Sequence, residues 1–221
     1  MAVQTISLDF WGTLVQANPE FKQAKIDLIQ QHFHADLDPD EIAATQRTVK
    51  RHYDNLVEAW GVQPTQATLF GDWFHQLGLE PEKYSFNHLL RFIDSYQATA
   101  YQLPAMPYDE SITSNLRALA RDFKLILISN TLFVSGSTIR AWLYALGWSA
   151  YFDQVIFSDE AGLAKPNPRI FGLAHHRIDT HIGDNPRTDA FGARQAGIAF
   201  IGVNGSYHHT LTDAYNRLKN G

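Results

Sequence analysis

The stretch ISLDFWGTL, residues 6–14, places a carboxylate directly after an apolar run and follows it with a glycine. Ile6 and Leu8 are typical of a short strand buried in a sheet, and Gly12 favours a tight turn of the backbone after that strand. In open α/β sheets, ligands bind outside the carboxyl ends of the strands. We therefore expect Asp9 to lie at a ligand-binding edge of a sheet.

The composition is that of a folded globular protein. The chain has 221 residues, 45% of them hydrophobic and 19% charged, which is enough to bury a substantial core. Its net charge of -5 and its pI near 6.0 disfavour nucleic acid or an anionic membrane as the main partner. The chain contains no cysteine, which excludes disulfides, zinc-thiolate sites and thiol catalysis and fits a cytoplasmic location. We expect neither a targeting segment nor a transmembrane segment.

Residues 16–105 are predicted to form a helical domain inserted after the first strand. Apolar residues recur there at the spacing of amphipathic helices, and Gly61 with Pro64 marks one break between helices. The spacing predicts about four helices, whose apolar positions are Leu28, Ile29 and Phe33; Val49, Tyr53, Leu56 and Trp60; Phe70, Trp73, Phe74 and Leu77; and Leu89, Leu90, Phe92 and Ile93.

From residue 106 onward the pattern alternates between helices and short apolar strands. Repeated βα units with mostly apolar strands predict a parallel sheet covered by helices on both faces, an α/β Rossmann-like core. Residues 1–15 and 106–221 would form this core. The expected strands are 123–128, 154–157, 180–183 and 199–203, and the expected helices are 111–121, 137–146, 169–176, one that ends near 197, and 211–218.

Polar residues repeatedly follow the ends of these strands. In a parallel sheet such ends share one edge, so residues far apart in the sequence converge on one crevice. Clustered carboxylates repel one another unless a cation neutralises them, and oxygen ligands suit Mg²⁺. A lysine supplies a point charge to a phosphate or a carboxylate, and a hydroxyl or backbone N–H donates to an anion. The residues at this edge are Asp9, Ser129, Asn130, Lys165, Asp184 and Asp189.

Four segments of the chain resemble, in order, the motifs of the haloacid dehalogenase superfamily of hydrolases. The segment DFWGTL at residues 9–14 is similar to the first motif, and Ser129-Asn130 to the second. The segment KPNPRIF at residues 165–171 is similar to the third motif, and Gly183-Asp184 with Asp189 to the fourth. The resemblance implies that the insert is the family's cap, which carries substrate specificity and closes over the site.

The resemblance also implies a site and a reaction. Asp9 would attack phosphorus to form an aspartyl phosphate. The substrate would be a small phosphorylated metabolite, bound by Ser129, Asn130 and Lys165 with Trp11 beside them. Mg²⁺ would be held by Asp9, Asp184 and the backbone carbonyl of Trp11, with Asp189 as a ligand or as a partner of the ligands. The sequence fixes neither the substrate nor the oligomeric state.

Trp11 departs from the pattern of the family's phosphatases. These enzymes usually carry a second Asp at this position, which protonates the leaving oxygen and later activates water. An indole is neither acid nor base at neutral pH, so a general acid-base contribution of roughly 10²–10⁴-fold is missing unless another group supplies it.

This departure leaves three alternatives to a phosphohydrolase. The first is a catalytically weak regulatory module that retains the phosphate and metal site. The second is a 2-haloacid dehalogenase, which also has an aromatic residue at this position but works without metal and without the Gly-Asp pair. The third is a phosphonate-cleaving enzyme with Lys22 or Lys25 as a Schiff base.

The ten histidines show no spacing typical of metal ligands, and His181 is interpreted as a packed core residue.

Overall fold

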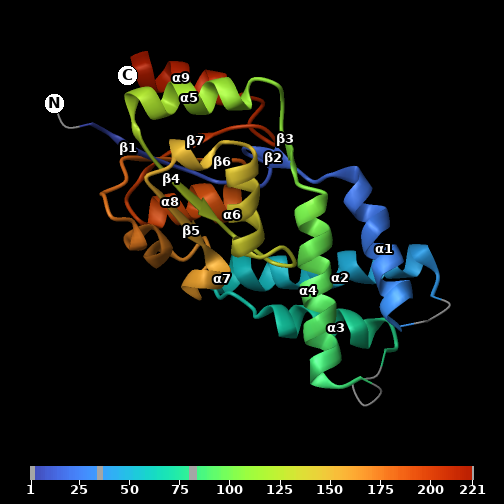
Figure 1. Cartoon of the computed structure of the whole chain (residues 1–221). Coiled ribbons are helices and arrows are strands. Elements are labelled where there is room, and N and C mark those ends of the chain that lie inside the picture. The colour runs from blue at the N-terminus through green and yellow to red at the C-terminus, as the bar shows by residue number, and fades with distance from the viewer. Residues whose placement is uncertain (1–2, 34–36, 80–83, 221) are drawn as a thin grey trace.

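The computed structural model describes residues 3–33, 37–79 and 84–220. Its main sheet has five parallel strands in the order β5-β4-β1-β6-β7 (Figure 1). These strands are β1 (Thr5–Leu8), β4 (Lys124–Ser129), β5 (Gln154–Phe157), β6 (Thr180–Gly183) and β7 (Ala199–Gly202). The predicted α/β Rossmann-like core is confirmed.

Helices cover both faces of this sheet. Along β4, Leu125 and Leu127 belong to the core cluster that includes side chains of α5, α6 and α9, whereas Ile126 and Ile128 pack with Phe171 and its neighbours. This alternation explains why the strand is continuously apolar, because each face needs its own apolar residues. The helices around the sheet are α5 (Ile112–Asp122), α6 (Gly136–Ala145), α7 (Ser158–Ala161), α8 (Phe191–Gln195) and α9 (Leu211–Asn220), with short 3₁₀ segments at Ser149–Tyr151 and Pro168–Leu173.

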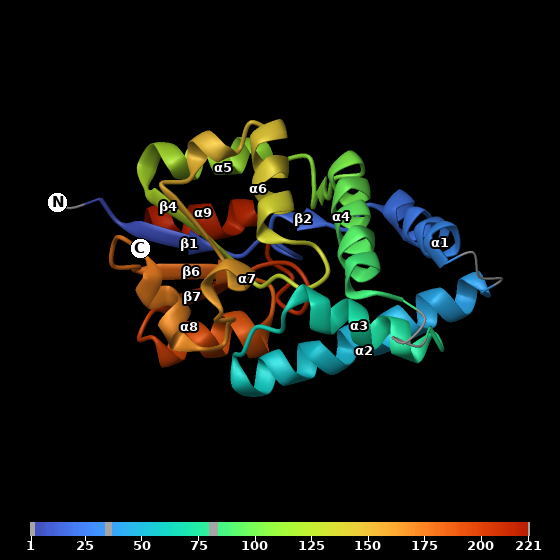
Figure 2. The same ribbon diagram turned by 60° about the horizontal axis from the view of Figure 1, so that its bottom comes forward.

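Four further helices lie together at one end of the sheet and are called here the four-helix group (Figure 2). The chain enters and leaves this group through an antiparallel pair of two-residue strands, β2 (Val15–Gln16) and β3 (Met106–Pro107). The interior of the group is aromatic and centres on Trp73, which is fully buried against Phe70, Phe92 and Tyr96. The helices are α1 (Pro19–Phe33), α2 (Pro39–Trp60), α3 (Gln66–Gln76) and α4 (Phe86–Gln102).

Two details of the sequence prediction are wrong. The predicted helix 169–176 is a 3₁₀ helix that ends at Leu173, because Gly172 is a poor helix former and the backbone becomes extended at Ala174. Leu56, Trp60 and Leu90, which the apolar pattern predicted to face the interior, are exposed, Trp60 by 73%. The buried stripe of α2 is formed by Ile42, Val49, Tyr53 and Val57, and Leu56 and Trp60 each lie one residue before a position that continues this stripe.

The strand order places the site at the centre of the sheet edge. β1 is hydrogen-bonded to β4 on one side and to β6 on the other, and it runs from the N-terminus toward the four-helix group (Figure 2). The residues that follow these three strands therefore meet beneath the helices.

Within the described part of the chain, no helix has both the length and the apolar character required to cross a membrane.

Candidate active site

Asp9 lies where β1 ends and the chain turns back. Its backbone N–H donates to the carbonyl of Ile182 on β6 at 2.9 Å, and the Thr13 hydroxyl donates to Asp9 Oδ2 at 3.2 Å. Two N–H groups of the following turn donate to the Phe10 carbonyl, a pattern that does not use the carbonyl of Trp11. The Asp9 side chain is 8% exposed, so the carboxylate is held in one position with little contact with water.

Lys165 joins two buried carboxylates. Its Nζ lies 2.6 Å from Asp9 Oδ1 and 2.6 Å from Asp189 Oδ1, and it also donates to the Ile128 carbonyl at 2.7 Å. The lysine side chain is 1% exposed. Burial alone would lower the pKa of Lys165, but the two carboxylates raise it above its ordinary value. The ammonium group therefore remains charged.

Asp184 completes a group of three carboxylates with Asp9 and Asp189. One oxygen from each lies within 4.8 Å of the others. Two glycines permit this approach: a Cβ on Gly12, whose φ is +75°, would lie 2.3 Å from Asp184 Oδ2, and a Cβ on Gly183 would lie 2.5 Å from Asp189 Cγ. The glycines of the first and fourth sequence motifs thus make room for the carboxylates.

The three carboxylates differ in their affinity for protons. Burial raises the pKa of Asp9 to about 7 despite the opposing charge of Lys165, and burial raises the pKa of Asp184 to about 6. Burial would also raise the pKa of Asp189, but Lys165 and His181 hold it below its usual range. Asp9 and Asp184 are thus the carboxylates that a cation would stabilise most in their charged form.

The donors in this cluster fit Mg²⁺. They are all oxygens, they converge within one ion's reach, and Asp184 lies at the cavity, where water and a phosphate oxygen could complete the coordination. Both oxygens of Asp189 are already engaged: Oδ1 by Lys165 and His181, and Oδ2 by the backbone N–H of Asn185 at 3.0 Å. This favours Asp189 as a residue that orients the other groups.

The two residues of the second motif lie close to Lys165. The side chain of Asn130 binds the backbone of Lys165 at both ends, since Nδ2 donates to its carbonyl and Oδ1 accepts from its N–H, each at 2.8 Å. Ser129 is fully buried, and its hydroxyl donates to the Asn130 carbonyl at 3.2 Å. Asn130 lines the cavity, whereas Ser129 does not line it in this conformation.

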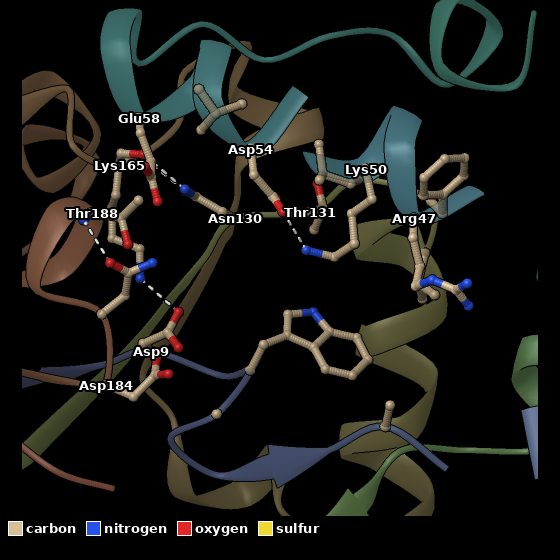
Figure 3. Close-up of a pocket in the computed structure, with 18 of the residues that line it drawn as sticks. Asp9, Arg47, Lys50, Asp54, Glu58, Asn130, Thr131, Lys165, Asp184 and Thr188 are labelled. Atoms are coloured by element: carbon tan, nitrogen blue, oxygen red, sulfur yellow. Dashed lines mark hydrogen bonds and ion pairs between the residues drawn. The ribbon is translucent and has the colours of Figure 1, made fainter. Parts of the chain in front are cut away.

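A cavity of about 570 Å³ opens beside the carboxylates, between the sheet edge and the four-helix group (Figure 3). It is lined by the site residues Asp9, Trp11, Asn130, Lys165, Asp184 and Asp189, and by residues of the four-helix group that include Phe21, Lys25, Arg47, Lys50, Asp54, Glu58 and Tyr96. The candidate Lys22 is exposed and is not part of this lining.

Of the lining residues from the four-helix group, only Lys25 was named by the sequence analysis, as a possible Schiff base, and the others were missed. Arg47, Lys50, Asp54 and Glu58 form a charged stripe at helical spacing on α2, next to the apolar stripe of the same helix. The sequence signal that could have identified them is the second, charged face of the amphipathic helix α2, which carries both acidic and basic side chains.

Trp11 forms part of the cavity wall. It is half-buried, and its ring packs edge-to-face against Phe10, with centroids 5.4 Å apart, and against Trp142, with centroids 5.9 Å apart. These contacts fix the indole at the position where the family's phosphatases carry an acid-base Asp. The indole offers a flat apolar surface there and no titratable proton.

His181 holds Asp189 from inside the sheet. Its Nε2 lies 3.1 Å from Asp189 Oδ1, and its Nδ1 lies 2.8 Å from the Ser7 hydroxyl. The ring is fully buried on β6, as expected of a core histidine, and burial lowers its pKa so that it is neutral at pH 7. It therefore positions Asp189, a role that its place within an apolar strand did not suggest.

A family model described as haloacid dehalogenase-like hydrolase matches residues 3–197. The chain belongs to this family. The match spans β1, the four-helix group and all the site residues, so the resemblance read from the four motifs is confirmed and the protein is a hydrolase.

Relatives of known structure and name agree with this assignment. Glyceraldehyde 3-phosphate phosphatase of Methanopyrus kandleri is 24% identical over 209 residues, which are 91% of this chain and 84% of that protein. The solved structure of YfnB of Bacillus subtilis, described as a HAD-hydrolase bound to magnesium, has a TM-score of 0.73 at 17% identity and covers 99% of this chain and 100% of its own. A 2-haloacid dehalogenase from Pseudomonas syringae has a TM-score of 0.68 at 18% identity, with 99% of both chains covered. At these identities the structures show the fold alone.

Proposed function

We propose that this hydrolase is a Mg²⁺-dependent phosphohydrolase that acts on small phosphorylated metabolites through an aspartyl phosphate on Asp9. The observation that carries the proposal is the buried group of Asp9, Lys165, Asp184 and Asp189 at the floor of the cavity. The phosphatase name of the Methanopyrus relative supports the same class of reaction. Residues 16–105 would act as the cap, and the lack of cysteine suits a cytoplasmic enzyme.

In this reaction a carboxylate oxygen of Asp9 attacks phosphorus and the bond to the ester oxygen breaks. The leaving oxygen takes up a proton from water and departs as an alcohol. Water then attacks the aspartyl phosphate, which releases inorganic phosphate and restores Asp9. Mg²⁺, held by Asp9, Asp184 and the Trp11 carbonyl, would offset the negative charge of the phosphoryl oxygens. Lys165 holds Asp9 in place and adds positive charge to the same region.

The first experiment measures phosphate release from a panel of phosphorylated metabolites, with Mg²⁺ and with a chelator. We expect turnover of at least one small phosphomonoester that requires Mg²⁺. Phosphate release that is unchanged by the chelator would contradict the metal-dependent mechanism. No phosphate release from any ester of the panel would instead favour the dehalogenase alternative, which a halide-release assay on 2-haloacids would then test. The binding of Mg²⁺ by calorimetry provides a measurement that does not depend on turnover.

Trp11 makes a catalytically weak regulatory module the second candidate function, because no titratable proton is available at its position. The substitution Trp11→Asp separates the two candidates. For a phosphohydrolase that lacks only its acid-base group, Trp11→Asp raises kcat on generic phosphate esters by roughly 10²–10⁴-fold in the presence of Mg²⁺.

The matched control for this experiment is Trp11→Asn, which removes the indole and leaves a polar side chain without an acidic group. A similar gain in both variants would mean that the indole obstructs the substrate. No gain in either variant would support the regulatory module.

A further inference from the structure

The cavity extends beyond the carboxylates to a wall formed by α1 and α2. In Figure 3, Arg47 and Lys50 on α2 lie across the cavity from Asp9 and Asp184. A volume of about 570 Å³ is in the range of sites that enclose a whole small molecule, so there is room for a leaving group beside the phosphoryl group. The charge on the far wall therefore bears on what that leaving group is.

Most of the charged side chains that line the cavity are paired. Lys165 is bound by Asp9 and Asp189, as described above. Lys50 lies 2.6 Å from Asp54, and Glu58 accepts from Arg187 at 3.0 Å. Among the residues that the structure describes, no carboxylate lies within 4.0 Å of the cationic groups of Lys25 or Arg47. These two cations therefore remain available to a ligand.

Lys25 is an unusual residue for a free cation because it is half-buried. Its Nζ donates to Gln46 Oε1 at 2.8 Å and lies 5.3 Å from the centre of the Phe21 ring. The ammonium has three N–H donors and no acceptor, so a single neutral partner leaves donors available. Burial lowers its pKa to about 8, with Lys22 adding to the effect, so most molecules carry the charge at pH 7. Burying a charge without a counter-ion is costly, and an anion that binds beside it offsets that cost.

We propose that Lys25 and Arg47 bind a second anionic group of the substrate, namely a carboxylate or a second phosphate carried by the leaving group. This inference rests on the proposed function, because it assumes that the phosphoryl group lies at Asp9. Phe21 of α1 and Tyr96 of α4 line the same cavity, with ring centroids 5.2 Å apart, and give the subsite an aromatic side. The substrate class is therefore a small phosphomonoester with a negative charge at its other end.

The test uses the Mg²⁺-loaded protein and two pairs of phosphate esters. 3-Phosphoglycerate and glycerol 3-phosphate differ by a carboxylate, and 1,3-propanediol bisphosphate and 1,3-propanediol monophosphate differ by a second phosphate. We expect the wild type to prefer the more anionic member of at least one pair by about 10-fold or more in kcat/KM. The pair that shows the larger preference identifies the anion that the subsite accepts.

The variant Lys25→Gln should remove this preference. We expect kcat/KM for the more anionic member to fall by about 10- to 100-fold, mainly through KM, and kcat/KM for the less anionic member to change less than about threefold. Lys25→Arg should retain most of the preference because it retains the charge. The matched control is Lys22→Gln on the same helix, where the side chain is exposed and outside the cavity lining, and the preference should be unchanged.

Equal kcat/KM values within both pairs for the wild type would overturn the proposal, as would equal losses for both members of a pair in Lys25→Gln. The preference within each pair is also measured as a ratio of Kd values, by calorimetry in the Asp9→Asn background. This measurement does not depend on turnover. A preference in Kd that needs Lys25, in a protein whose wild type releases phosphate from neither these four esters nor any member of the metabolite panel, would uphold the subsite and reject the proposed function. No preference in Kd would reject the subsite even if all four esters were hydrolysed.

Discussion

Asp9→Asn is expected to lower kcat for phosphate ester hydrolysis by on the order of 10⁴- to 10⁶-fold, the range seen when an enzyme loses its nucleophile. The amide is close in size to the carboxylate but is a poor nucleophile, so the variant removes the attacking group with little change of shape. Steady-state phosphate release in the presence of Mg²⁺ measures the effect. The intact mass of acid-quenched protein measures the phosphoryl adduct, which should form in the wild type and be absent from the variant.

The control for this prediction is Asp94→Asn, which makes the same chemical change at an exposed position on α4. Its kcat should equal that of the wild type. Turnover in Asp9→Asn close to the wild-type rate would show that another group attacks the substrate, and the proposed site would then be wrong. Mg²⁺ binding to Asp9→Asn should also weaken, because the variant replaces one anionic ligand.

Lys165→Met is expected to lower the free energy of unfolding by about 3–5 kcal/mol, the typical cost of removing one partner from a buried ion pair. Methionine fills most of the space of the lysine side chain, but it leaves Asp9 and Asp189 without the cation that lies 2.6 Å from each. Urea unfolding with a chelator present measures the loss without a contribution from Mg²⁺.

Two variants check the cause of that loss. In Lys165→Met with Asp189→Asn, one of the two facing carboxylates is removed, so the double variant should be more stable than the additive sum of the two single changes. Lys219→Met removes an exposed ion pair with Asp122 at 3.1 Å and should cost less than about 1 kcal/mol. A loss of similar size in Lys219→Met and Lys165→Met would mean that burial of the pair does not matter.

The core of the fold could be predicted because its signals are local. Each strand of the sheet is a short apolar run, and a strand with both faces buried needs apolar residues at every position. The floor of the site could also be predicted, because residues at the ends of neighbouring parallel strands lie close together. This holds regardless of how many residues separate the strands in the sequence. Asp9 and Lys165 are in contact although the sequence separates them by 156 positions.

The far wall of the cavity could not be predicted in the same way. Arg47 lines the cavity only because of how α2 packs on its neighbours, for example on α3, where Trp73 Nε1 donates to the Thr45 hydroxyl of α2 at 3.2 Å. The roles of Asn130 and His181 were missed for a different reason. Each acts by hydrogen-bonding another residue, and such partners are visible only in three dimensions.

The central position of β1 has a consequence for how the chain is made. β1 is synthesised before the other strands of the main sheet, but its hydrogen-bonding neighbours are β4, which begins at Lys124, and β6, which begins at Thr180. At a synthesis rate of about 5–20 residues per second, both edges of β1 lack a partner strand for roughly 6–24 seconds, the time needed to synthesise the chain as far as the end of β4. A chain that is stalled before β6 should therefore keep one edge of β1 without a partner strand, and its hydrolase site can form only after β6 and the residues that follow it have been synthesised.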